Sequence, residues 1–171
     1  MKIDTDDFAL FGLPRRFALD SADLDGRRRS LQAEVHPDRF AAAGAAAQRL
    51  SMQWAVRVNE AYHRLRDPLR RAGYLCELAG VPVSAEENTA MPAAFLEQQM
   101  SWREALDEAS TPEAIEAVAG TLVAERDRAF AGLEQSLDVD EDPAAAARQV
   151  RALMFVERFA ADVDQRLAGE P

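Results

Sequence analysis

Apolar residues recur every three or four positions along most of the chain, the spacing that places them on one face of an α-helix. This pattern predicts a long helix whose apolar face consists of Leu50, Trp54, Val58, Ala61 and Leu65. It also predicts an earlier helix from about Ser21 to Val35, with Asp20 as its N-cap. Because a loop of small residues, 41–47, joins the two helices, we expect them to pack antiparallel as a hairpin.

Shorter helices are predicted on both sides of this hairpin. A first helix ends at Gly12-Leu13-Pro14, which is a helix-stop signal. After a break at Asp67-Pro68, the segment 69–78 continues as a helix. Residues 81–90 are then the predicted linker to the second half of the chain.

The second half predicts three further amphipathic helices with short connections, which would form a small antiparallel bundle. Pro92 suits a first helical position, and Thr111-Pro112 and Asp142-Pro143 begin the second and third helices. The three core stripes are Phe95, Trp102 and Leu106; Ile115, Val118, Leu122, Ala129 and Leu133; and Leu153, Val156, Ala160, Val163 and Leu167. Since no segment alternates over the length of a strand, the predicted fold class is all-α.

The tripeptide His36-Pro37-Asp38 interrupts the helical pattern of the hairpin. Proline has no amide hydrogen and disfavours the helical conformation of the residue before it, so the helix should end at His36. The imidazole and the Asp38 carboxylate would then project from an exposed turn. By composition alone the triplet arises in about one chain in a hundred of this size, so an ordinary helix-terminating turn is the alternative.

Charge is distributed unevenly along the 171 residues. Residues 1–80 hold 13 Lys and Arg against 11 Asp and Glu, whereas residues 81–171 hold 7 against 19. The acidic second half argues against nucleic-acid binding. No apolar run approaches transmembrane length, and the acidic N-terminal sequence lacks the apolar stretch of a secretory signal. We therefore expect a cytoplasmic protein that does not associate with membranes.

Enzymatic and metal-binding functions find little support in the sequence. The single cysteine, Cys76, cannot supply the four thiolates of an iron–sulfur cluster, and a half-buried helical thiol is expected there. His36, Asp38 and His63 could be imagined as a metal or hydrolytic site, but no zinc or nucleophile motif accompanies them. The acidic stretch 138–142 resembles the start of a calcium loop, but Pro143 stands where the sharp turn needs glycine. We expect no catalysis, cofactor or metal.

The residues around the tripeptide point to a family. Arg28-Arg29-Ser30-Leu31 precede it, and Val58-Asn59-Glu60-Ala61-Tyr62 and Arg66-Asp67-Pro68 follow it. This layout resembles a J-domain, the ATPase-stimulating module of DnaJ-type co-chaperones. The resemblance implies that His36, Pro37, Asp38, Arg28 and Arg29 bind a DnaK-class chaperone, although a run of arginines is by itself typical of a solvated face. J-proteins commonly have a basic residue two before the histidine, and Glu34 in its place favours a specialised partner.

Segments outside the hairpin indicate which family of J-proteins the chain resembles. They are Asp7-Phe8-Ala9-Leu10-Phe11-Gly12-Leu13-Pro14, Pro68-Leu69-Arg70-Arg71-Ala72-Gly73-Tyr74-Leu75, Ala94-Phe95-Leu96-Glu97-Gln98 and Arg103-Glu104-Ala105-Leu106-Asp107-Glu108. Together they resemble the HscB family, the J-type co-chaperones of iron–sulfur cluster biogenesis, over nearly the whole chain. That resemblance implies an HscA-type chaperone and the scaffold protein IscU as partners.

Some apolar residues of the bundle lie beside the predicted core stripes. Leu96 and Met100 are about 100° round the helix from Phe95 and Trp102, and Phe155 lies next to its stripe. A wide core stripe could include all three. The resemblance implies instead that Leu96, Met100, Glu104 and Phe155 bind the scaffold. Glu97 and Ser101 depart from the family, which tends to have an apolar residue and an acid at these positions.

These observations predict a two-domain co-chaperone that is not an enzyme. Residues 1–75 would form the J-domain, 76–85 a connecting segment and 86–171 the scaffold-binding bundle. The alternative is a generic J-protein whose bundle binds another client or forms a homodimer.

Overall fold

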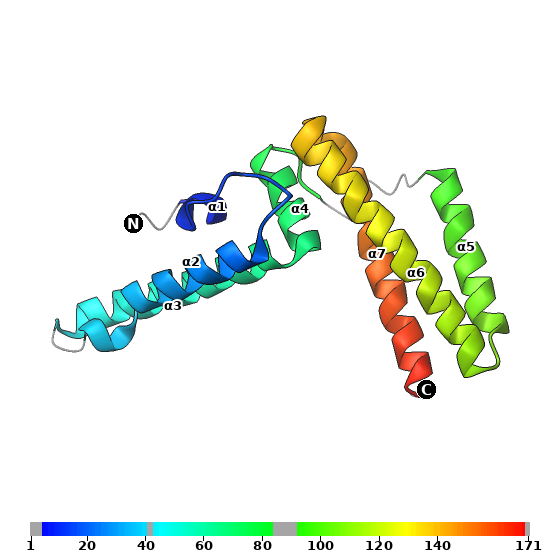
Figure 1. Cartoon of the computed structure of the whole chain (residues 1–171), viewed down its shortest axis with the longest axis horizontal. Helices are drawn as coiled ribbons and strands as arrows, with labels where there is room; N and C mark the ends of the chain where they lie inside the picture. Colours follow the sequence, from blue (N-terminus) through cyan, green and yellow to red (C-terminus); the bar gives the residue numbers. More distant parts are fainter. Residues whose placement is uncertain (1–4, 41–42, 84–91, 170–171) are drawn as a thin grey trace. The chain divides into compact units, whose positions relative to one another are not determined.

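The chain folds into helices arranged in two units. The computed structural model describes residues 5–40, 43–83 and 92–169, and these contain helices and no strand (Figure 1). The compact units are Met1–Leu75 and Cys76–Pro171. Residues 84–90 of the predicted linker lie outside the described residues.

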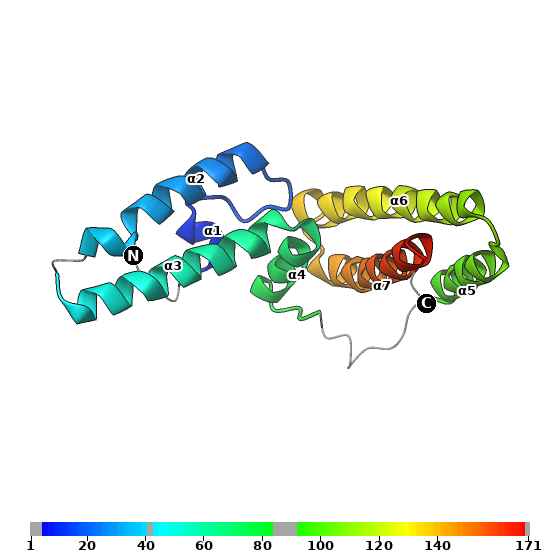
Figure 2. The ribbon, with the colours of Figure 1, turned by 90° about the horizontal axis from the view of Figure 1, so that it is seen from below.

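The first unit is built on the predicted hairpin. Helix α2 (Ser21–Glu34) and helix α3 (Ala45–Arg66) lie side by side and antiparallel, joined by a chain segment that includes the 3₁₀ turn η1 (Pro37–Phe40) (Figures 1 and 2). The Asp20 carboxylate accepts hydrogen bonds from two amides in the first turn of α2, as expected of an N-cap. The buried apolar residues of this hairpin are Leu24 on α2, Val35 at its C-cap, and Val58, Ala61 and Leu65 on α3.

A series of polar contacts runs along the same interface. Three side-chain hydrogen bonds join α2 to α3, with donor to acceptor distances of 2.6, 2.8 and 2.9 Å. Arg66 donates to Ser21, Tyr62 donates to Asp25 and Gln32 donates to Asn59. Their α2 members are four and seven residues apart, so they occupy one face of the helix. These contacts fix the register of the hairpin, since a shift of either helix would break all three together.

Helix α1 (Asp7–Leu10) is tied to the hairpin through a fully buried carboxylate. The Asp7 side chain pairs with Arg57 at 2.6 Å and with Arg64 at 2.9 Å, both on α3. The Asp7 amide donates to the hydroxyl of Tyr74 on helix α4 (Pro68–Leu78) at 3.0 Å, and Phe8 stacks on the Tyr74 ring. One acidic residue therefore links three helices.

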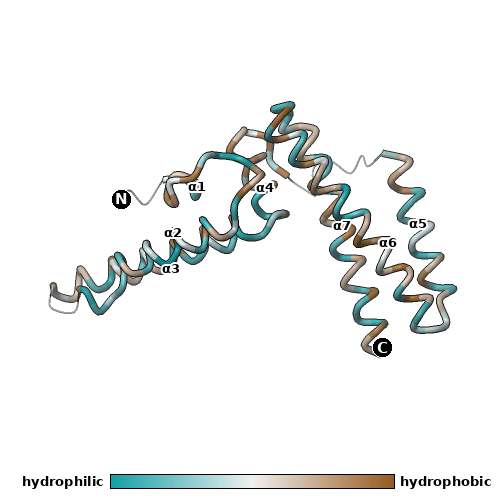
Figure 3. The backbone as a smooth tube through the Cα atoms, viewed as in Figure 1, coloured by the Kyte–Doolittle hydropathy of each residue, from teal (hydrophilic) through white to brown (hydrophobic). Residues whose placement is uncertain are grey.

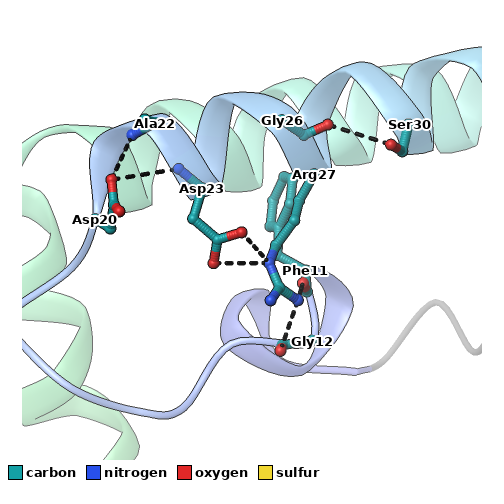
Figure 4. A network of polar contacts seen from close by, with 8 residues as sticks. All are labelled: Phe11, Gly12, Asp20, Ala22, Asp23, Gly26, Arg27 and Ser30. Carbon is teal, nitrogen blue, oxygen red and sulfur yellow. Dashed lines mark hydrogen bonds and ion pairs between the residues drawn. The ribbon is translucent and has the colours of Figure 1, made fainter.

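The connection between α1 and α2 is fixed by Arg27. Its guanidinium donates to the carbonyls of Phe11 and Gly12, both at 2.9 Å, while its Nε contacts Asp23 at 3.0 Å (Figure 4). Gly12 has φ of +63°, a left-handed conformation that suits glycine. Arg27 is the first of three consecutive arginines, Arg27 to Arg29, and it stabilises the fold.

The second unit contains the three predicted long helices. They are α5 (Ala93–Glu108), α6 (Pro112–Glu134) and α7 (Pro143–Leu167), and Thr111 and Asp142 cap the last two. Helices α6 and α7 pack along their lengths, and brown and teal residues alternate along both (Figure 3). The buried residues include most of the predicted stripes: Trp102, Leu106, Ile115, Val118, Leu122, Leu133, Leu153, Val156 and Val163.

Two predicted core residues are exposed. Leu50 is 51% exposed, because it precedes Val58 by eight residues and so points about 80° away from it. Ser51, seven residues before Val58, is buried in its place. Leu167 is 37% exposed because it is the last residue of α7, where the helix has no further turn beside it.

Two predicted connections are shorter than expected, and the acidic stretch 138–142 is partly helical. Ala45 to Ala47 belong to α3 and not to the loop. The predicted connecting segment 76–85 begins inside α4, since Cys76 is buried and the helix runs to Leu78. The acidic stretch 138–142 overlaps a π-helical turn, η2 (Gln135–Val139), that continues α6.

Replacement of Asp7 tests the link between α1, α3 and α4. We expect Asp7→Ala to lower the free energy of unfolding by about 2–3 kcal/mol, because two arginines lose a buried partner while keeping partial access to water. Urea denaturation measures the change. Glu60→Ala, at an exposed position on α3, is the control and should stay within about 0.5 kcal/mol of wild type. A similar small change for Asp7→Ala would contradict this account.

Candidate functional site

The tripeptide lies at the tip of the hairpin, as predicted. Helix α2 ends at Glu34, Val35 is its C-cap residue, and Pro37 begins the turn η1. The side chains of His36 and Asp38 are 58% and 90% exposed. Both are therefore accessible to a partner protein.

His36 is held in place by hydrogen bonds on each side. The Ser51 hydroxyl of α3 donates to the carbonyl of Val35 at 2.6 Å. The Arg39 amide donates to the carbonyl of His36 at 3.0 Å, and the Asp38 amide donates to its Nδ1 at 3.3 Å. The same Nδ1 lies 3.6 Å from a carboxylate oxygen of Asp38, so both contacts of the ring are with Asp38.

Ser51 is the residue of this site that sequence reasoning missed. The adjacent Leu50 is apolar, and the sequence pattern therefore places Leu50 and not Ser51 on the core face. The spacing of seven residues between Ser51, Val58 and Leu65 is the signal that could have identified it, since such residues share one helical face.

The two arginines predicted to bind the chaperone differ in their surroundings. The guanidinium of Arg28 lies 4.2 Å from the centre of the Tyr62 ring, whose hydroxyl donates to Asp25. Arg28 is half-buried, and its Nε is buried without a hydrogen-bond acceptor among the described residues. Arg29 is exposed. Arg28 therefore contributes to the hairpin as well as to its surface charge.

In the second unit, the predicted scaffold-binding residues lie outside the core or at its edge. Leu96 and Met100, one turn apart on α5, are 46% and 63% exposed, and Glu104 on the next turn is also exposed. Their exposure excludes the alternative that a wide core stripe includes both apolar residues. Glu97 and Ser101, the two residues that differ from the family's usual types, are exposed as well. We call Leu96, Met100 and Glu104 the α5 patch.

Phe155 is connected to this helix by ring contacts. It is half-buried on α7, with its ring centroid 6.0 Å from that of Phe95 and 6.1 Å from that of Phe159. The guanidinium of Arg103, on α5, lies 5.8 Å from the centre of the Phe155 ring. Phe155 is thus both a packing residue and a partly accessible one.

Among the described residues, no group of three His, Cys, Asp or Glu side chains could hold a metal ion. His63 is exposed, and its ring contacts that of Tyr62 edge to face. Cys76 is fully buried, and burial raises the pKa of its thiol to about 11, so little of it is thiolate at neutral pH. No helix in the described ranges has the length and apolarity needed to span a bilayer.

Known proteins are similar to this chain in sequence and in fold. Residues 91–164 match a family model described as the HSCB C-terminal oligomerisation domain. A Burkholderia multivorans protein described as a co-chaperone protein HscB homologue is 52% identical over 163 residues, which cover 94% of this chain and 93% of that one. The chain belongs to the HscB family of co-chaperones.

Solved HscB structures have the same fold. Chaperone HscB from Vibrio cholerae matches with a TM-score of 0.80 and 35% identity, covering 94% of this chain and 96% of that one. Human co-chaperone HscB matches with a TM-score of 0.90 and 25% identity, covering 97% and 84%. The first unit is accordingly the J-domain of an HscB-family protein, and the second is its helical C-terminal domain.

Substitution of the two arginines should separate packing from charge. We expect Arg28→Ala to lower the free energy of unfolding by about 1 kcal/mol, because it removes the contact with the Tyr62 ring and the apolar stem of the side chain. Arg29→Ala, the matched control, should change it by less than about 0.5 kcal/mol. Chemical denaturation of both variants provides the measurement, and equal effects would contradict the assignment.

Proposed function

We propose that this protein stimulates the ATPase of an HscA/DnaK-class chaperone and brings an IscU-type iron–sulfur scaffold protein to it in the cytoplasm. The observation that supports the proposal most is the exposed His36-Pro37-Asp38 tip of a J-domain hairpin. Family membership supports it independently, since the relatives are named co-chaperones. The chain itself is proposed to have no catalytic role.

The tip would act by binding and not by chemistry. ATP hydrolysis takes place in the partner, and His36 would change the populations of the partner's conformations. Such an effect requires that the tip bind the hydrolysis-competent arrangement more tightly than the alternatives. An exposed imidazole held in the turn by the hydrogen bond from the Asp38 amide suits selective binding of this kind.

The arginines of α2 would favour encounter with an acidic ATPase domain. Attraction between exposed charges mainly raises the association rate and weakens with salt. Arg29 suits this role best because its charge is exposed. The exposed Glu34 lowers the positive charge close to His36, which favours a specialised partner over a general one.

The α5 patch and Phe155 would bind the scaffold. Exposed Leu96 and Met100 supply an apolar centre, and Glu104 supplies an acidic edge. Protein interfaces commonly combine a small apolar centre with a polar rim. Glu97 and Ser101, which differ from the family's usual residue types, would adapt this surface to the protein's own scaffold.

Self-association of the second unit is the alternative function of this surface. It is favoured by the description of the matching family model as an oligomerisation domain and by the exposed apolar residues of α5. Sedimentation velocity separates the two: a monomer that gains mass only with scaffold supports the proposal, and a dimer disrupted by Met100→Ala supports the alternative.

Replacement of His36 tests the role of the tip. We expect His36→Gln to lose stimulation of ATP turnover in an HscA-type chaperone, while the thermal melt and scaffold binding stay unchanged because the side chain is exposed. Steady-state turnover is the measurement, and His63→Gln, at the other histidine, is the control. Equal stimulation by both variants would contradict the role of His36, and no stimulation by the wild-type protein would overturn the proposed function.

Replacement of the exposed apolar residues tests the α5 patch. We expect Leu96→Ala with Met100→Ala to weaken scaffold binding at least tenfold, because central apolar contacts commonly contribute about 1–3 kcal/mol each. Stimulation without scaffold should be unchanged. Isothermal titration calorimetry measures the affinity, and Val123→Ala, exposed on α6, is the control. Unaltered affinity of the double variant would place the scaffold contact elsewhere.

A further inference from the structure

We propose that Ser51 is a positioning residue for His36, which sets the direction of the imidazole that the chaperone recognises. This inference rests on the proposed function of the tip. Ser51 belongs to α3, fifteen residues after His36 in the sequence, and its side chain is buried. It reaches the tip through one hydrogen bond, from its hydroxyl to the carbonyl of Val35 at 2.6 Å.

That carbonyl belongs to the peptide unit that ends at the His36 nitrogen. Because a peptide unit is planar, a bond to the Val35 oxygen also fixes the orientation of the His36 N–H. The next peptide unit, between His36 and Pro37, is held by the Arg39 amide, which donates to the His36 carbonyl at 3.0 Å. Both peptide planes that flank His36 are therefore fixed, one locally and one by Ser51.

The side chain has a third point of attachment. The Asp38 amide donates to Nδ1 of His36 at 3.3 Å, so the ring turns its Nδ1 inward along the turn. Rotation of the Val35 to His36 peptide plane would move the imidazole relative to Asp38 and break this bond. The hydroxyl of Ser51 is the part of this arrangement that comes from α3, and it transmits the rigidity of the hairpin to the tip.

Loss of the hydroxyl would leave the Val35 carbonyl without this partner at a buried residue. An unsatisfied buried carbonyl turns toward water where it can, and that turn rotates the peptide plane beside His36. Ser51→Ala should thus allow several tip conformations, of which only a fraction presents the imidazole correctly. The arginine charges of α2 remain, so encounter with the chaperone continues.

Steady-state ATP turnover of an HscA-type chaperone, titrated with this protein, tests the consequence. We expect Ser51→Ala to lower maximal stimulation three- to tenfold, with the half-maximal concentration changed less than about twofold. Gln32→Ala is the matched control, since it removes another hydrogen bond across the hairpin, to Asn59, away from the tip. It should keep maximal stimulation.

The outcomes separate the inference from the function on which it rests. Full maximal stimulation by Ser51→Ala, or an equal loss in Gln32→Ala, would overturn the positioning role while leaving the proposed function in place. Absence of stimulation by the wild-type protein would overturn the proposed function.

Backbone dynamics provide a readout that needs no chaperone. ¹⁵N relaxation of the full-length protein should give order parameters of about 0.85 at His36, Asp38 and Arg39, falling below about 0.6 in Ser51→Ala and unchanged in Gln32→Ala. A tip that is equally ordered in Ser51→Ala, or already mobile in the wild-type protein, would contradict the positioning role even if stimulation were lost.

Discussion

The proline at position 37 determines the form of the first unit. It has no amide hydrogen to continue α2 and it disfavours helical geometry at His36, so the helix must end and the chain must turn. Once α3 begins beyond the loop, the apolar faces of α2 and α3 can only meet in an antiparallel arrangement. The contacts of Ser21, Asp25 and Gln32 with α3 then fix the register. The tripeptide remains at the exposed end because the same residue terminates the helix and initiates the turn.

Much of this arrangement could be predicted because it depends on local rules. The limits of α2 follow from Asp20 and Pro37, and those of α6 and α7 from their capping residues. The features that the sequence did not predict depend on contacts between helices. Leu50 and Ser51 are neighbours, and only the packing of α3 against α2 decides which is buried. Likewise, Asp7 gives no local sign that two arginines 50 and 57 residues later will neutralise it.

The candidate sites, too, could be predicted only where local sequence rules decide them. Exposure of the tip and of Leu96 and Met100 agrees with the helical phase predicted from sequence. The double role of Arg28 does not follow from sequence, since a run of three arginines gives no indication that Arg27 bonds to the end of α1 and Arg28 covers Tyr62. Charge patterns locate a basic surface, but only the neighbouring helices determine which charges remain available to a partner.

The two units divide the proposed work between them. The J-domain presents hydrogen-bonding groups on a constrained turn, whereas the second unit presents apolar side chains on the face of a helix. The protein's proposed contribution is to bring two partners together through one chain. Linking two binding sites raises the effective concentration of one partner near the other without any new contact.

Mixing two variants in one assay tests this linkage most directly. His36→Gln keeps only the α5 patch, and Leu96→Ala with Met100→Ala keeps only the tip. In steady-state ATP turnover with chaperone and scaffold present, the account predicts that the mixture fails to restore the stimulation given by the wild-type protein at the same total concentration. Full restoration by the mixture would contradict the account, because it would mean that the two sites need not belong to the same chain.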